Sequence, residues 1–142
     1  MDNEITVMRA VGRLHAEWRR HMRRRALSVG IPDSYRPVIM FLKRNPGSNQ
    51  RMLAEFSGTT CAAVNQIVKK MEADGYVEKR ESDSDGRMSL LFLTEKGMNR
   101  ADALLEALSI SDKKITESIG VKREEELIGL IRELTLVVGD LE

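Results

Sequence analysis

The spacing of apolar residues predicts a mainly helical protein, because they recur at intervals of three and four over most of the chain. Residues 4 to 28 contain no proline, and one apolar stripe runs along them, formed by Val7, Val11, Leu14, Trp18 and Met22. This stripe predicts a long amphipathic first helix. The Gly-Ile-Pro sequence at 30–32 ends that helix, and Asp33 or Ser34 can cap the next one.

A second helix is predicted from about residue 34 to residue 44, with Pro37 in its first turn, where a missing amide hydrogen costs little. This helix is apolar nearly all round, so we expect it to be the most buried element. The sequence Asn-Pro-Gly-Ser at 45–48 indicates a turn. A short helix follows over about residues 49–56, and its expected buried face consists of Met52, Leu53 and Phe56.

A further helix is predicted to begin after a cap at Thr60 and to end before Gly75, which can adopt the left-handed conformation. Its expected inward residues are Val64, Ile67, Val68 and Met71. The apolar pattern then changes in residues 76–80 and 88–93, which read as two strands with a polar tip between them over 82–87. These residues predict a β-hairpin.

Two long helices complete the predicted elements. Thr94 can cap the first, which reaches about residue 119, although Gly97 takes the place of the Glu or Gln of a full capping box. The last helix covers about residues 122–141, with apolar residues at nearly heptad spacing: Leu127, Ile131, Leu134, Val138 and Leu141. Such a stripe usually faces a partner helix. The expected fold class is therefore mainly α with a small β-hairpin.

A buried helix, a helix–turn–helix pair and a hairpin, in this order, predict a winged helix–turn–helix. The helix that follows Thr60 carries the candidate chemistry, because short polar side chains near a helix start fit the major groove of DNA. The candidate base-reading residues are Ala62, Asn65 and Gln66. Lys69 and Lys70 would meet phosphates, as would the amides near Thr60. An ordinary amphipathic helix with a polar face explains this element equally well when it is taken alone.

Three motifs follow one another towards the end of residues 53–97. The first, within 71–80, is Met-Glu, then Gly-Tyr-Val, then Arg; the second is Asp-Gly-Arg at 85–87; the third is Leu-Thr at 93–94 followed by Gly97. In this order they resemble the MarR family of bacterial winged-helix transcription regulators, which has Leu for the Met and one residue fewer before the first Arg. The resemblance covers essentially the full length, because the family also has one long N-terminal and two long C-terminal helices.

The resemblance implies three parts: an N-terminal dimerisation helix at 1–32, a DNA-binding winged helix–turn–helix at 33–95 and C-terminal dimerisation helices at 96–142. It implies a homodimer that binds a pseudo-palindromic operator in double-stranded DNA. Arg87 at the wing tip would enter the minor groove. Asp85 would hold the wing in shape by pairing with an arginine such as Arg80, although an Asp-Gly pair is also typical of a plain hairpin turn.

The sequence departs from the family at the residues that would meet DNA. The family often has Ser or Thr and then Arg where this chain has Asn65 and Gln66, so its preferred bases do not carry over. Gly86 replaces one arginine of the usual wing pair. Lys and Arg total 23 against 22 Asp and Glu, but residues 1–48 carry ten basic and four acidic groups. We expect Arg36 and the arginines within 19–25 to add phosphate contacts. A solvated helix face is the simpler interpretation of that cluster.

The resemblance also implies a sensor, because family members commonly bind a small phenolic or aromatic acid between the dimer helices and the DNA-binding lobe. The candidate lining residues are His15, Trp18, Met22, Met40 and Arg44. For each residue alone, a place in the core or the dimer interface is the simpler interpretation. Repression is favoured over activation, because it requires only occupancy of a promoter. The effector, the operator and the regulated genes follow from no pattern in the sequence.

Composition excludes several other classes. One cysteine rules out a disulfide framework, and the two histidines, six residues apart, lie roughly 120° apart around a helix, so neither a metal site nor a cofactor is expected. Nothing in the sequence resembles a nucleophile–base pair or a phosphate-binding glycine loop, so we expect no enzyme. Because no apolar run approaches about 18 residues and the start is acidic, we expect a cytoplasmic protein without a membrane span.

Two alternative functions stay open. The acidic wing, with Glu81 and Asp83 near its tip, favours a winged-helix module that binds protein and little DNA. Cys61 lies in the first turn of the proposed recognition helix, where oxidation would place a bulky or charged group against DNA, as in a redox-responsive regulator. The usual role of a lone cysteine, a small buried hydrophobe, is the simpler interpretation.

Overall fold

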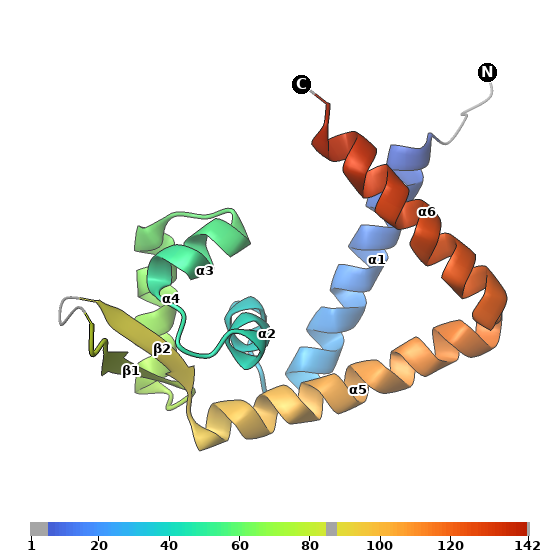
Figure 1. The fold of residues 1–142 in the computed structure, drawn as a ribbon. Helices are drawn as coiled ribbons and strands as arrows, with labels where there is room; N and C mark the ends of the chain where they lie inside the picture. The colour runs from blue at the N-terminus through green and yellow to red at the C-terminus, as the bar shows by residue number, and fades with distance from the viewer. Residues whose placement is uncertain (1–5, 85–87, 142) are drawn as a thin grey trace. The chain divides into compact units, whose positions relative to one another are not determined.

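The computed structural model describes residues 6–84 and 88–141. In these residues, helices and strands follow in the order α1 (Val7–Ser28), α2 (Arg36–Arg44), α3 (Gln50–Ser57), α4 (Cys61–Ala73), β1 (Val77–Glu81), β2 (Ser89–Leu93), α5 (Glu95–Ile119) and α6 (Val121–Gly139) (Figure 1). Residues Met1–Leu105 form one compact unit and Glu106–Glu142 a second. The predicted fold class, mainly helical with a small hairpin, is confirmed.

Helix α2 supplies the centre of the core of the first unit. Val38, Ile39, Phe41 and Leu42 are buried, which is four of its nine residues, against three of thirteen in α4. The prediction that this helix is the most buried is therefore confirmed. Proline lies in its first turn, where the missing amide hydrogen removes no intrahelical bond.

The helix pair α3 and α4 is delimited by side-chain caps and one glycine. The Asn49 side chain accepts a hydrogen bond from the Met52 amide at 2.9 Å, and the Thr60 hydroxyl accepts one from the Ala63 amide at 3.1 Å. Between the two helices, Gly58 adopts a left-handed conformation with φ +61°. The predicted cap at Thr60 is confirmed, and it places the start of α4 directly after the turn.

The start of α2 differs from the prediction. The N-cap of α2 is Tyr35 and makes no side-chain capping bond, so neither Asp33 nor Ser34 caps this helix. The Asp33 carboxylate instead lies 3.5 Å from the Arg36 guanidinium as an ion pair. The Tyr35 side chain is buried, and its backbone amide donates to the Pro32 carbonyl at 2.9 Å, which closes a turn before the helix begins.

The buried face of α3 is also rotated relative to the prediction. Leu53 and Ala54 are buried, whereas Met52 is 47% exposed and Phe56 is 65% exposed. Phe56 still meets the buried Phe41 ring, with the two ring centroids 4.7 Å apart. In a helix of only eight residues, the apolar spacing fits two faces, and packing on α4 and β2 selects between them.

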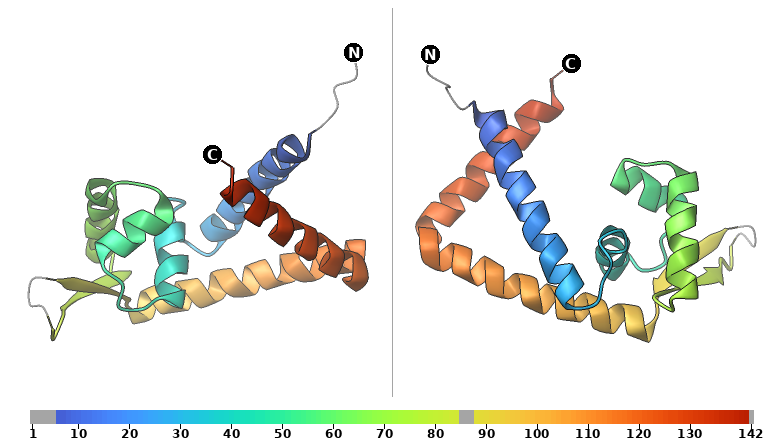
Figure 2. Two further views of the ribbon diagram at one scale, coloured as in Figure 1. Left: turned by 45° about the horizontal axis from the view of Figure 1, so that its top comes forward. Right: turned by 180° about the vertical axis from the view of Figure 1, so that it is seen from behind.

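The hairpin packs against all three helices of the helix–turn–helix region. Strands β1 and β2 are antiparallel, with pairs from Val77 and Leu93 at the base to Glu81 and Ser89 near the tip. The turn before α3 joins this sheet, because the Gly47 amide donates to the Leu91 carbonyl at 2.9 Å and the Leu91 amide donates to the Ser48 carbonyl at 2.8 Å. Figure 2 shows the hairpin projecting beyond α3 and α4.

Thr94 joins the end of α4, the base of the hairpin and the start of α5. Its hydroxyl donates to the Gly75 carbonyl at 2.5 Å and accepts from the Gly97 amide at 3.1 Å, so the predicted cap is formed. A Cβ atom on Gly97 would collide with the Tyr76 carbonyl oxygen. This close approach explains why glycine, and not the Glu of a capping box, occupies the position.

We expect Gly97→Ala to destabilise the fold by about 1–3 kcal/mol, because backbone lies directly against the added methyl group. The matched control is Gly12→Ala in α1, where nothing lies within 4 Å of an added Cβ. Alanine there should stabilise the helix by up to about 1 kcal/mol. Thermal unfolding of both variants checks this, and equal melting temperatures for the two would contradict it.

Tyr35 and Tyr76 tie the segment before α2 to the end of α4. The Tyr35 hydroxyl donates to the Asp74 carboxylate at 2.6 Å, and the Tyr76 hydroxyl donates to the Gly30 carbonyl at 3.0 Å. The two rings meet edge to face with centroids 5.6 Å apart. The hydrogen bond to Asp74, followed by burial and by negative charge, raises the pKa of Tyr35 to about 12.

We expect the wild-type protein to lose stability more steeply than Tyr35→Phe as the pH rises from 10 to about 12. An unfolded tyrosine titrates near pH 10, whereas folded Tyr35 stays neutral until about pH 12. Its contribution is therefore fully present below pH 10 and is lost as the pH rises through the folded pKa. Melting temperatures of both proteins from pH 8 upwards test this, and parallel curves would refute it.

The second unit contains the end of α5 and the whole of α6. Gly120, with φ +85°, joins the two helices, and the Thr116 hydroxyl lies 2.9 Å from both carboxylate oxygens of Glu124. No residue of α6 is buried. Its exposed large apolar residues are Val121, Leu127, Ile128, Leu130, Ile131, Leu136, Val137 and Val138. In residues 6–84 and 88–141, no helix is long and apolar enough to cross a membrane.

Candidate nucleic-acid interface

Helix α4 places the predicted reading residues on one outer face. Val64, Val68 and Met71 are buried and fix which side of the helix faces the core. The remaining side presents Asn65, which is half-buried, and four exposed residues: Ala62, Gln66, Lys69 and Lys70. The structure therefore brings five of the sequence-predicted DNA-binding residues together on a single helix.

The start of α4 is open to solvent. Thr60 and Cys61 are both exposed, and the Thr60 hydroxyl already accepts the Ala63 amide. The first amides of a helix have no partner within the helix and lie at its positive end, so this terminus suits an anion such as a phosphate.

Asn65 makes a contact that the sequence does not reveal. Gln50, the first residue of α3, donates from Nε2 to Asn65 Oδ1 at 3.3 Å. Both side chains are half-buried, so the bond lies at the junction of the two helices. No periodic pattern connects residues 15 positions apart on different helices, and only their packing brings these two amides together.

The basic groups of β1 are paired with acids. Lys79 lies 3.2 Å from the Glu72 carboxylate. The Arg80 guanidinium binds Glu78 through Nε at 2.9 Å and also lies over the Phe92 ring, 4.2 Å from its centroid. The predicted wing residues Asp85 and Arg87 lie outside the described residues.

Arg36 lies apart from the α4 face, in a basic pocket between α1 and the start of α2. The pocket has a volume of about 240 Å³ and is lined by Ala16, Arg19, Arg20, Arg23, Asp33 and Arg36. The Arg36 side chain is 15% exposed and forms the 3.5 Å ion pair with Asp33. Four guanidinium groups around one carboxylate leave this pocket positively charged.

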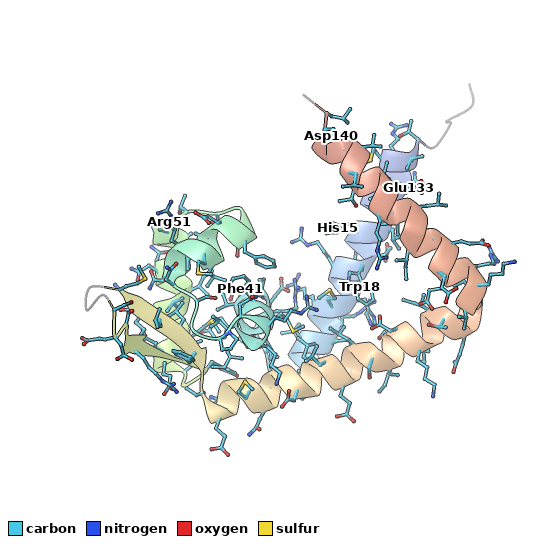
Figure 3. All side chains as sticks on the ribbon, in the orientation of Figure 1. His15, Trp18, Phe41, Arg51, Glu133 and Asp140 are labelled. Atoms are coloured by element: carbon cyan, nitrogen blue, oxygen red, sulfur yellow. The ribbon has the colours of Figure 1, made fainter. Side chains whose placement is uncertain are left out.

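The predicted effector residues are not among those that line this pocket. His15 and Trp18 both lie on α1 (Figure 3). His15 is exposed, whereas Trp18 and Met22 of the same helix are half-buried. On α2, Met40 is half-buried and Arg44 exposed.

Histidine 21 lies beside Trp18, and the two rings stack with centroids 5.3 Å apart. Desolvation, followed by the positive charges of Arg25 and Arg24, lowers the pKa of His21. His21 is therefore neutral at physiological pH and adds no positive charge to the arginines of α1.

Comparisons with known proteins agree with this geometry. A model of the MarR family matches residues 29–88. The chain is 27% identical over 96 residues to the HTH-type transcriptional regulator BilQ of Clostridium symbiosum, a match that covers 68% of this chain and 67% of BilQ. The solved transcriptional repressor CouR, bound to a 23-mer DNA duplex, is 19% identical with a TM-score of 0.79 over 95% of this chain and 99% of CouR.

A second solved structure, the PcaV transcriptional regulator of Streptomyces coelicolor in complex with its natural ligand, has a TM-score of 0.72 at 21% identity and covers 95% of each chain. Residues 29–88 thus match the MarR family, and the chain has the winged helix–turn–helix fold of these transcriptional regulators. The resemblance seen in its three motifs is thereby confirmed. Since the matched relatives are regulators, the expectation that the chain is not an enzyme is confirmed as well.

Proposed function

We propose that this chain is a homodimeric repressor that binds a pseudo-palindromic operator in double-stranded DNA and leaves it when a small-molecule effector binds. One observation carries the proposal: the outer face of α4 holds small, amide and lysine side chains directly after a turn and an open helix start. A helix of this kind fits the major groove, where amides reach base edges and lysines reach phosphates. The repressor CouR, bound to DNA in its structure, supports the same arrangement.

Each side chain of this face has a separate part in the proposal. Asn65, Gln66 and Ala62 read bases, because amides bond adenine edges and a methyl group contacts the thymine methyl. Lys69, Lys70 and the amides after Thr60 hold phosphates and set the register. Arg87 enters the minor groove and Asp85 holds the wing, a role that rests on the family resemblance.

Dimerisation is proposed through residues 1–32 and 96–142, on either side of a DNA-binding domain at 33–95. Besides the apolar residues of α6, large apolar residues are also exposed on α1 and α5, where they include Val7, Leu14, Ile110 and Ile115. Large exposed apolar patches usually mark an interface. Two recognition helices about 34 Å apart would meet successive major grooves of one operator.

The effector is proposed to be a small aromatic acid that enters the arginine pocket. Arg19, Arg23 and Arg36 can pair with a carboxylate through two parallel hydrogen bonds. Trp18 and Met22 point to other sides of α1 at 100° per residue, so in this proposal the arginines hold the carboxylate and the predicted aromatic and methionine residues do not line the pocket. The pairing of Arg36 with Asp33 favours this role over the phosphate contact expected from sequence. The effector acts only if it prefers one spacing of the two recognition helices.

The test is fluorescence anisotropy of the full chain on labelled DNA from upstream of its own gene, against a scrambled duplex, over a salt series. We expect the chain to prefer the upstream duplex. A plot of the logarithm of the binding constant against the logarithm of the salt concentration should fall with a slope of roughly 0.9 for each phosphate contact, and the slope should indicate several contacts. Benzoate, as a simple aromatic carboxylate, should then release the wild-type protein from the duplex and should not release the Arg23→Ala variant. Selection from a randomised duplex library completes the test. A chain that enriches no sequence there would be a protein-binding module instead.

A further inference from the structure

The contact between Gln50 and Asn65 determines which groups of the Asn65 amide are available outside the protein. Gln50 Nε2 donates to Asn65 Oδ1 at 3.3 Å, which fixes the orientation of the amide on the outer side of α4. A carbonyl oxygen has two lone pairs, and an amide nitrogen has two hydrogens. With one lone pair engaged, Asn65 keeps one acceptor position and both donor hydrogens.

We propose that Gln50 is a positioning residue that sets the base preference of Asn65, so that Asn65 selects adenine. This inference rests on the proposed binding of DNA by α4. Adenine presents an N7 acceptor and an N6 donor in the major groove, and guanine presents two acceptors, N7 and O6. The amide of Asn65 is held with one acceptor and one donor side by side, so it can bond both the N6 and the N7 group of adenine. With guanine, its carbonyl oxygen would face the O6 acceptor, and the two oxygens would repel each other.

Three features favour this role for Gln50 over a merely structural one. Gln50 is the first residue of α3, where the helix needs no particular side chain, because Asn49 already caps it. Its amide is half-buried, as is that of Asn65, so the bond is partly shielded from water. The neighbouring Arg51 and Glu55 pair with each other at 3.2 Å along the exposed side of α3 and leave the contact undisturbed.

The experiment compares the base preferences of the full chain and its variants, each selected against the same randomised duplex library and sequenced. Gln50→Met has nearly the same size and cannot donate a hydrogen bond. Gln50→Lys keeps a donor at this position and serves as the rescue variant. Asn65→Ala removes the reading group, and Gln66→Ala, on the same face of α4, is the matched control. Preferences within one library do not depend on the overall affinity of each variant.

We expect the wild type to prefer adenine roughly tenfold at one position of each half-site, the discrimination that one bidentate contact provides. Asn65→Ala and Gln50→Met should both lower that preference to about twofold or less, a small part of what a bidentate contact provides, while Gln50→Lys retains it. Gln66→Ala should alter a different position. An unchanged preference in Gln50→Met, or a base other than adenine at the Asn65 position, would overturn the inference and leave DNA binding intact. A wild type that enriches no motif would overturn the proposed function itself.

Discussion

Ala62→Glu is expected to weaken DNA binding at least 100-fold, equivalent to about 3 kcal/mol. Ala62 is exposed in the first turn of α4, on the face proposed to enter the major groove. A carboxylate there is repelled by phosphates and cannot lie against a thymine methyl group. The fold should not suffer, because a negative charge in the first turn of a helix interacts favourably with the helix dipole. Anisotropy with the duplex selected by the wild type measures the loss.

The matched control for this substitution is Ala73→Glu, at the other end of the same helix. Ala73 is also exposed, and it lies about 16 Å from Ala62 along the helix axis. The two variants carry the same net charge, so a general electrostatic effect would weaken both equally. If the start of α4 lies in the groove, the DNA affinity of Ala62→Glu falls far more than that of Ala73→Glu. Equal affinities for the two variants would show that α4 does not enter the groove.

The fold could be predicted from the sequence wherever a local signal had one structural meaning. The Thr60 and Thr94 caps and the left-handed Gly75 are each fixed by a side chain or a backbone conformation within a few residues. Where a local pattern was compatible with two structures, the sequence alone did not determine which of them forms. Asp33 is a good N-cap residue, yet it pairs with Arg36, and the buried Tyr35 takes the N-cap position. The exposed Phe56 follows the same rule, since tertiary packing selected another face of α3.

The sequence predicted which helix carries the candidate site, but it did not predict the contacts that this helix and α1 make with their neighbours. The periodicity of α4 separates inner from outer residues, so Gln66 and Lys69 could be placed on the outer face. The bond between Gln50 and Asn65 joins two helices and has no signal in either helix alone. The pocket around Arg36 likewise depends on how α1 packs against the start of α2, which no spacing along the chain encodes.

The double variant Leu127→Lys, Ile131→Lys is expected to convert the proposed dimer to a monomer. Both residues lie on the heptad-like stripe of α6 and are 45% and 44% exposed in the single chain, so the substitutions should not disturb the fold of the subunit. In a dimer these side chains would be buried, and burial of each such residue contributes about 1.5–3 kcal/mol. Less than half of each side chain is still exposed, so two residues in each of two subunits give a loss of about 3–5 kcal/mol, roughly 1,000-fold in the dimer dissociation constant. Sedimentation equilibrium measures it.

The consequence for DNA binding follows from the two-fold arrangement. In a dimer, the second recognition helix binds its half-site at a high effective concentration, so loss of the dimer should weaken operator binding by about 100-fold or more although α4 is unchanged. Glu125→Lys is the control, because at 100° per residue this exposed position lies on the side of α6 away from Leu127. It should leave both the dimer and the operator affinity within about twofold of the wild type, as surface changes outside an interface usually do. A monomeric double variant with wild-type operator affinity would show that each subunit recognises DNA independently.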